Sequence, residues 1–207
     1  EKEDIDSWTC FLVQKEVKGF SAGRNELKMG QRASSATELI FEDVFVPSSH
    51  VIGGLRNGWS LSRTVLNYSR IPVAAIALGI ARGAFEASID FATTHALASR
   101  KLIEYQEVQL SLARMFTLTN AMRSMVWSNA AHWTARQAYA SATKVFCSDT
   151  AMQVADLAME LMGNHGLEQR TYAEKALRDA RLTQIYEGTN QINLLGIIED
   201  QYTEFFK

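Results

Sequence analysis

The chain has 207 residues, 47% of them hydrophobic and 21% charged, which suits one large globular domain or one domain with a smaller neighbour. Its formal net charge of -2 offers no basic surface, so we expect neither a nucleic acid nor an anionic membrane as partner. No apolar run reaches the roughly 20 residues of a membrane span. The longest, Ile71 to Ala84, contains Arg82, so we expect no membrane span.

The first 50 residues have a short, β-like pattern. We expect one strand at 8–13 and a second at 37–46, where apolar and polar residues alternate until Pro47. Two or three strands cannot close a core alone, and the chain opens without an initiator Met. We therefore expect residues 1–52 to be a partial β-domain and the chain to be the C-terminal part of a longer protein.

After Gly53-Gly54 the apolar residues adopt helical spacing. We expect helices at about 59–93, where Pro72 either kinks the helix or starts a second segment, and at 104–133. Two more follow, at 138–162, with Gly163 left-handed at its end, and at 189–206. The predicted fold is mainly α: residues 53–207 form an antiparallel four-helix bundle.

The two cysteines, Cys10 and Cys147, lie far apart and form no C-x-x-C pair. This pattern argues against a disulfide framework or a zinc site and predicts two inert thiols. It favours a reducing compartment. We expect the cytoplasm, with the mitochondrial matrix left open.

The segment with the clearest chemical potential precedes the last expected helix. It places the carboxylate of Glu187 beside Gly188, and Thr189 can cap the helix that follows. A helix N-terminus favours a phosphate. Ile185 and Tyr186 supply apolar walls, which can make a carboxylate a usable general base. The alternative is a glutamate that merely caps a surface helix.

This segment, Ile185-Tyr-Glu-Gly-Thr-Asn-Gln-Ile192, preceded by Arg178-Asp-Ala, resembles the signature of the acyl-CoA dehydrogenase family. Further resemblances follow in the family's order along nearly the whole chain. They are Lys28-Met-Gly-Gln-Arg-Ala-Ser-Ser35, Glu38-Leu-Ile-Phe-Glu-Asp-Val-Phe-Val-Pro47, Val51-Ile-Gly, Gly58-Trp59, Leu66-Asn-Tyr-Ser-Arg70, Ala77-Leu-Gly-Ile-Ala81, Glu104-Tyr-Gln106 and Glu160-Leu-Met-Gly163.

The resemblance implies a flavoenzyme in which Glu187 removes the α-proton of an acyl-CoA thioester. The β-hydrogen leaves as hydride to FAD, and the product is a trans-2-enoyl-CoA. A flavin hydroxyl and the backbone N–H of Glu187 would hold the thioester oxygen. Some relatives carry the base on the first bundle helix, near Ser69, but serine cannot serve as that base.

The other implied roles carry over onto single positions. Substrate binding is implied for Arg70, Tyr186 and Gly188, although Arg70 can also be an ordinary helix arginine. The implied partners are an acyl-CoA substrate, electron-transfer flavoprotein or another electron acceptor, and further copies of the chain in a dimer or homotetramer built through the bundle. FAD binding is implied for Gln106, Thr189 and Gln191 and, toward a neighbouring subunit's cofactor, for Glu160, Gly163 and Asn164.

One loop departs from the family. An Arg-x-x-Phe-Gly motif that holds the FAD pyrophosphate is replaced by His95-Ala-Leu-Ala-Ser99, and a largely neutral imidazole cannot reproduce the guanidinium fork. Arg100 and Lys101 are the nearby candidates to replace that arginine. Glu160 stands where many relatives have glutamine. The family's N-terminal helical domain and first β-strands also have no counterpart in this sequence, so it should hold only half of the flavin pocket. We therefore expect the chain alone to bind FAD poorly or not at all and to be inactive.

Two other functions stay open at this stage. The first is a related flavoprotein oxidase or monooxygenase, although monooxygenase relatives often lack the base. The second is a non-catalytic partner subunit of an acyl-CoA dehydrogenase heteromer, which the altered His95 loop favours. The length and branching of the acyl chain are not encoded in any motif found here.

Overall fold

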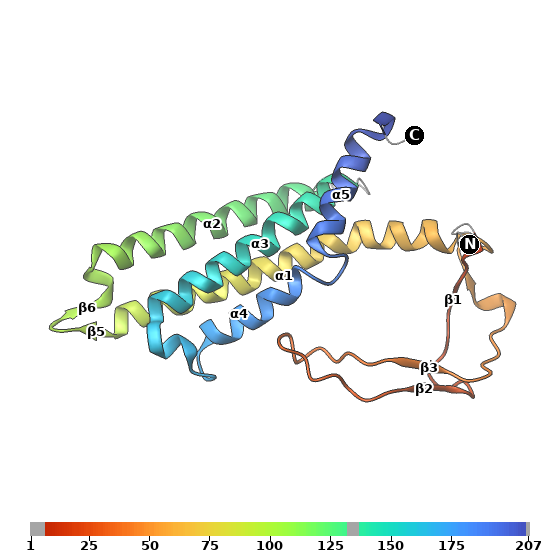
Figure 1. Cartoon of the computed structure of the whole chain (residues 1–207), viewed down its shortest axis with the longest axis horizontal. Coiled ribbons are helices and arrows are strands. Elements are labelled where there is room, and N and C mark those ends of the chain that lie inside the picture. Colours follow the sequence, from red (N-terminus) through yellow and green to blue (C-terminus); the bar gives the residue numbers. More distant parts are fainter. Residues whose placement is uncertain (1–6, 132–136, 206–207) are drawn as a thin grey trace. The chain divides into compact units, whose positions relative to one another are not determined.

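The computed structural model describes residues 7–131 and 137–205 (Figure 1). It is mainly helical with a few short strands, which confirms the predicted fold class. The chain forms two compact units: Glu1–Lys28 with Arg32–Leu66, and Met29–Gln31 with Asn67–Lys207. The change from one unit to the other falls inside helix α1 (Gly58–Thr94). The domain division at residue 52 stays a prediction.

The first unit contains two short antiparallel strand pairs. Strand β1 (Cys10–Phe11) pairs with β4 (Val51–Ile52), and β2 (Phe20–Ala22) pairs with β3 (Leu39–Phe41). The two predicted strands thus contain β1 and β3, but their paired parts are shorter than predicted. Within the described part of this unit no large apolar side chain is buried, and Phe45 is 79% exposed. This agrees with the expectation that these strands close no core by themselves.

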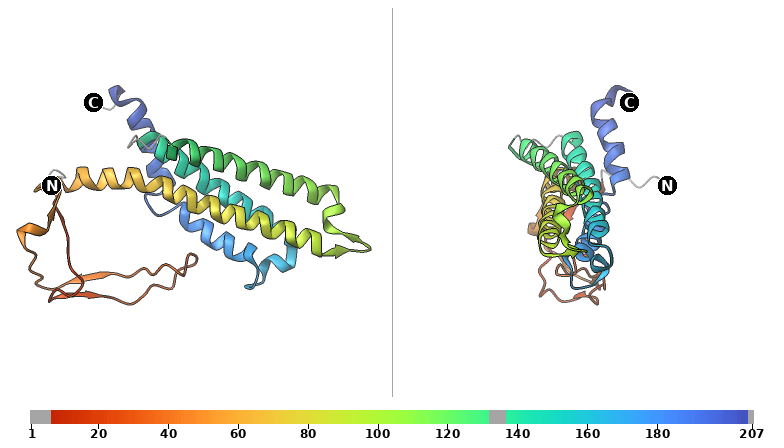
Figure 2. Two further views of the ribbon diagram at one scale, coloured as in Figure 1. Left: turned by 180° about the vertical axis from the view of Figure 1, so that it is seen from behind. Right: turned by 90° about the vertical axis from the view of Figure 1, so that its left-hand side faces the viewer.

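The second unit is a helical bundle. Beyond Asn67, α1 runs beside α2 (Gln106–Ala131), α3 (Gln137–Met162) and α4 (Tyr172–Thr183), and α5 (Asn190–Gln201) follows at one end (Figures 1 and 2). The core is rich in alanine, which lets helices approach closely, and methionine fills the remaining gaps. Its buried members include Ala77, Ala81, Ala84, Met115, Met122, Ala151, Val154, Ala155, Ala158 and Ala176.

Helix α1 is continuous through Pro72, so this proline does not start a second segment. A proline removes one backbone hydrogen bond but has a helical φ. The helix persists because Ile71, Val73 and Ala74 beside it are buried in the bundle. Helix α5 ends at Gln201, earlier than predicted, and a 3₁₀ turn follows at Thr203–Phe205. Residues 132–133 and 206, where two predicted helices end, lie outside the described residues.

Strands β2 and β4, helix α4 and a hairpin in the His95 loop were not predicted. Helix α4 is short and polar, and only Ala173, Ala176 and Ala180 give it a buried apolar face. The His95 loop forms a small hairpin between β5 (Ala96–Leu97) and β6 (Arg100–Lys101).

By length and composition, α1 could cross a membrane. This finding is weak, because the core helix of a soluble bundle passes the same test, and several α1 side chains belong to the core described above. The absence of a membrane span stays a prediction.

Candidate active site

The turn between α4 and α5 carries Glu187 in an unusual backbone conformation. Its φ is 56° and that of Gly188 is 84°, so both residues are left-handed. Glycine adopts this region freely, whereas a glutamate there is uncommon and points to a functional constraint. The turn is closed by the backbone N–H of Asn190, which donates to the carbonyl of Gln184 at 3.0 Å.

Thr189 is the N-cap of α5, as predicted. Its hydroxyl accepts a hydrogen bond from the backbone N–H of Ile192 at 3.4 Å. Helix α5 therefore begins directly after the turn, with Gln191 exposed in its first turn. The positive end of the helix dipole lies beside the Glu187–Gly188 segment.

A contact from α1 fixes the Glu187 side chain. The Ser69 hydroxyl donates to Oε2 of Glu187 at 2.5 Å, although 118 residues separate them in sequence. The carboxylate is neither fully buried nor fully exposed. The sequence excluded Ser69 as a base but did not indicate that it binds the carboxylate.

Arg70, the next residue of α1, also reaches the turn. It is only 6% exposed, and its Nη1 donates to Asn67 Oδ1 at 2.8 Å and to Ser141 Oγ at 3.0 Å. Its Nη2 lies 4.0 Å from where a Cβ on Gly188 would stand. The structure therefore brings Arg70 to Gly188, whereas an ordinary helix arginine would extend into solvent.

Lys144 of α3 is the functional candidate that the sequence reasoning missed. It is fully buried (0% exposed), and its Nζ donates to the Gly188 carbonyl and to Asn190 Oδ1, both at 2.8 Å. Burial lowers the pKa of Lys144 to about 8, and Asp149 and Glu187 act against that shift. The sequence feature that could have identified Lys144 is a single lysine inside a helix that is apolar on several faces.

The amide of Asn190 extends this network. Its Nδ2 donates to Ser148 Oγ at 2.9 Å and to Asp149 Oδ1 at 2.7 Å. Gln184, at the start of the turn, donates to the same Asp149 oxygen at 2.6 Å. The buried Ser148 and the exposed Asp149 thus tie both ends of the turn to α3.

Tyr186, predicted to line the acyl region, is half-buried next to Glu187. Burial raises the pKa of its hydroxyl. Gln31 lies close enough to oppose that shift, but no hydrogen bond of normal geometry reaches the buried Tyr186 oxygen from any residue that the structure describes.

Two of the motifs behind the family resemblance contact each other. The backbone N–H of Gln31 donates to Asp179 Oδ1 at 2.5 Å, and Arg178 Nη1 donates to the Met29 carbonyl at 2.7 Å. A Cβ on Gly30 would lie 2.2 Å from the Arg178 carbonyl oxygen, so only glycine fits there. The segment Met29–Gln31 is therefore held on α4, shortly before the turn that carries Glu187.

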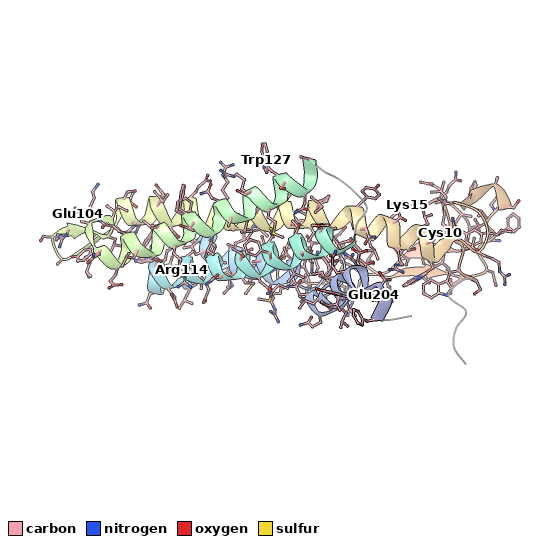
Figure 3. All side chains as sticks on the ribbon, turned by 90° about the horizontal axis from the view of Figure 1, so that it is seen from above. Cys10, Lys15, Glu104, Arg114, Trp127 and Glu204 are labelled. Carbon is pink, nitrogen blue, oxygen red and sulfur yellow. The ribbon has the colours of Figure 1, made fainter. Side chains whose placement is uncertain are left out.

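The remaining predicted cofactor residues lie at the other end of the bundle. Gln106 begins α2, and Glu160, Gly163 and Asn164 are at or beyond the end of α3, all exposed. Glu160 follows Lys144 by 16 residues of α3, about 24 Å at 1.5 Å per residue. In Figure 3, Glu104 marks this end and Glu204 lies toward the opposite one.

This far end has its own geometry. Gly163 is left-handed (φ 55°), as predicted, and no heavy atom lies within 4 Å of where its Cβ would be. The His95 ring stacks on Phe91, with centroids 3.8 Å apart, and lies 5.4 Å from the His165 ring. Arg100 donates to the Glu104 carbonyl at 2.8 Å, which leaves Lys101 as the freer candidate to replace the missing arginine.

The cysteines take no part in either cluster. Cys147 is buried, and burial raises its pKa to about 12, so the thiol stays protonated and inert. Cys10 is half-buried in the first unit, and neither cysteine forms a disulfide. Among the described residues no group of three histidine, cysteine or acidic side chains could hold a metal ion.

Comparison with known proteins places this bundle in a known class of helical domain. Residues 56–202 match the family model described as "Acyl-CoA dehydrogenase, C-terminal domain". The acyl-CoA dehydrogenase of Bacillus subtilis (strain 168) is 38% identical over 193 residues, which cover 91% of this chain and 51% of that protein. The chain thus spans about half the length of this relative.

Solved structures agree. Butyryl-CoA dehydrogenase from Megasphaera elsdenii matches with a TM-score of 0.91 and 31% identity over 95% of this chain and 52% of its own. An acyl-CoA dehydrogenase from Bacillus anthracis, solved in complex with FAD, matches with a TM-score of 0.90 and 26% identity over 96% of this chain and 38% of its own. The chain therefore belongs to the acyl-CoA dehydrogenase family.

Proposed function

We propose that the protein containing this chain is an FAD-dependent acyl-CoA dehydrogenase, which converts an acyl-CoA thioester to a trans-2-enoyl-CoA. The observation that carries the proposal is the left-handed turn at Glu187 and Gly188. The turn lies at the start of α5 and carries both the carboxylate and the backbone N–H of Glu187. The relatives of this chain are named for this reaction. One residue can then remove the α-proton and bind the thioester oxygen.

The neighbouring side chains support this role for Glu187. The Ser69 hydroxyl orients the carboxylate, since it donates to only one of the two oxygens in the contact at 2.5 Å. Arg70, buried beside Gly188, supplies a fixed positive charge where the thioester would lie. Tyr186 is half-buried and provides an apolar wall that excludes water from the acyl chain.

The residues present fit an FAD molecule. Thr189 and Gln191 at the N-terminus of α5 would hold a phosphate or ribose group. Gly163, left-handed and open, allows a dinucleotide to approach the backbone closely. When bound, FAD supplies the redox chemistry by accepting the β-hydrogen as hydride.

The separation of the two clusters supports a homo-oligomer. Glu160 is about 24 Å along α3 from Lys144, which contacts the turn, so the two clusters of one chain would serve different FAD molecules. A dimer or tetramer assembled through the bundle would bring the far cluster of one copy to the flavin of another. Electron-transfer flavoprotein or another acceptor would reoxidise the flavin, in the cytoplasm or the mitochondrial matrix.

The test is Glu187→Gln in the full-length protein, with Glu199→Gln on the exposed face of α5 as a matched control. Loss of a general base typically slows a reaction 10²- to 10⁴-fold, so we expect the rate of enoyl-CoA formation to fall by about that factor. The flavin absorbance should persist in both variants. Wild-type activity in Glu187→Gln would contradict the proposal.

One alternative has an observation in its favour. The loop has His95 where the family has an arginine, and the His95 ring stacks on Phe91, which favours a non-catalytic partner subunit. Such a subunit would give no enoyl-CoA even with flavin bound. The related oxidase is distinguished by stoichiometric oxygen consumption without an added electron acceptor.

A further inference from the structure

Lys144 is a buried charged group for which the proposed chemistry has no direct use. It is the largest fully buried side chain among the described residues. A lysine is almost never fully buried unless its ammonium group is paired, because removing the charge from water is costly. Its partners therefore show what the burial achieves.

Gly188 and Asn190, which accept hydrogen bonds from Lys144, lie in and directly after the turn that carries Glu187. The ammonium donates to the Gly188 carbonyl and to the side chain of Asn190, each at 2.8 Å. The Gly188 carbonyl also accepts from Asn193 Nδ2 at 2.8 Å. One group on α3 thus holds the residue directly after the glutamate and the first residue of α5.

The charges around Lys144 come from three elements. Burial lowers its pKa to about 8, and Arg70 on α1 acts in the same direction. Asp149 on α3 and Glu187 in the turn act in the opposite direction. At neutral pH the amine therefore keeps its proton and all three N–H donors.

We propose that Lys144 is a positioning residue for Glu187: its two hydrogen bonds hold Gly188 and Asn190 on α3 and so keep Glu187 in its left-handed conformation. The carboxylate and the backbone N–H of Glu187 then stay aimed at one substrate. This inference rests on the proposed role of Glu187 as the base. Whether Lys144 fixes the turn can be measured by amide hydrogen exchange, without an assay of enzyme activity.

The first experiment compares Lys144→Met with Lys15→Met, an exposed lysine of the first unit (Figure 3), in the full-length protein with butyryl-CoA as the probe substrate. Methionine fills a similar volume without the donors. A base displaced by about 1 Å can cost 10²-fold in rate. We expect kcat to fall about 10- to 100-fold in Lys144→Met, with KM changed less than about threefold, and Lys15→Met to match the wild type.

The second experiment measures amide hydrogen exchange over residues 184–193. We expect faster exchange in Lys144→Met and wild-type exchange in Lys15→Met. The thermal midpoint should change little, because the Gly188 carbonyl still accepts from Asn193 and Asn190 Oδ1 still accepts from Ser148. A slower enzyme that is equally stable separates positioning from folding.

If Lys144→Met does not fold, Asn190→Ser decides, with the double variant Ser148→Ala/Asp149→Ala as its matched control, because Asn190 also donates to Ser148 and Asp149. In Asn190→Ser the shorter side chain cannot reach Lys144, while the bond from Lys144 to Gly188 remains. Asn190→Ser should shift kcat and exchange in the same direction as Lys144→Met, by less than that variant and by more than the double variant. A wild type inactive toward butyryl-CoA would count against the proposed function for this substrate, and exchange alone would then test Lys144. Wild-type kcat together with wild-type exchange in Lys144→Met, or in Asn190→Ser where that variant decides, would overturn the inference.

Discussion

At the scale of single residues, the contact between Ser69 and Glu187 leads to a prediction. Ser69→Ala removes a donor to the carboxylate, and a hydrogen bond to a charged group is worth about 1.5–3 kcal/mol. We expect kcat/KM to fall by about tenfold or more.

The control is Ser69→Thr, which keeps the hydroxyl in the same place. It should recover most of the rate. A Ser69→Ala variant with the wild-type kcat/KM would show that the contact does not act on the base.

Glu187, Gly188 and Thr189 follow one another in the chain, so cap chemistry and the family signature identified them together. Arg70 was indicated by the family resemblance alone. Ser69 and Lys144 could not be placed in the same way, because each reaches the turn from a different helix and their contacts depend on how those helices pack. A buried polar network has no local signature in the sequence.

At the scale of elements, the attachment of Met29–Gln31 to α4 can be tested with a pair of glycine variants. In Gly30→Ala the new Cβ would meet the Arg178 carbonyl, so the segment must move, at a typical cost of about 1–3 kcal/mol. We expect a lower thermal midpoint and faster amide exchange at Gln31, whose N–H is bound by Asp179.

Gly79→Ala is the matched control on α1. No neighbouring atom lies within 4 Å of the new Cβ, and alanine favours a helix over glycine by roughly 1 kcal/mol. This variant should raise the midpoint. Equal effects of the two substitutions would refute the tight contact between Gly30 and α4.

The predicted elements differ in accuracy for physical reasons. Helices α2 and α3 are long, and their apolar periodicity identified them and most of their length. Helix α4 was missed because alanine is its only buried apolar residue type, so its spacing gives a weak signal. The strands were predicted too long because alternation shows which residues are extended, whereas pairing depends on a partner strand.

At the scale of the whole molecule, the arrangement of the two clusters predicts how FAD binds. The chain spans about half of its relatives' length, and the large apolar side chains of its first unit, such as Phe45 and Leu55, are exposed. A flavin pocket assembled from one turn and from a far cluster of another copy has few contacts within a single chain. We therefore predict that the 207-residue chain alone binds FAD weakly, whereas the full-length protein binds it tightly.

The measurement is a titration with FAD, followed by flavin fluorescence, together with the molar mass in solution. The full-length protein should be a dimer or tetramer with bound flavin. Gly163→Val, which fills the open left-handed position, should weaken FAD binding without changing proton removal at Glu187. Because Gly163 and Glu187 lie at opposite ends of the bundle, mixing Gly163→Val with Glu187→Gln subunits tests the assembly directly. If one copy completes the site of another, some sites in the mixture contain both substitutions and others contain neither. The activity of the mixture should then exceed that of either variant alone. A tight yellow complex of the isolated chain as a monomer would contradict this arrangement.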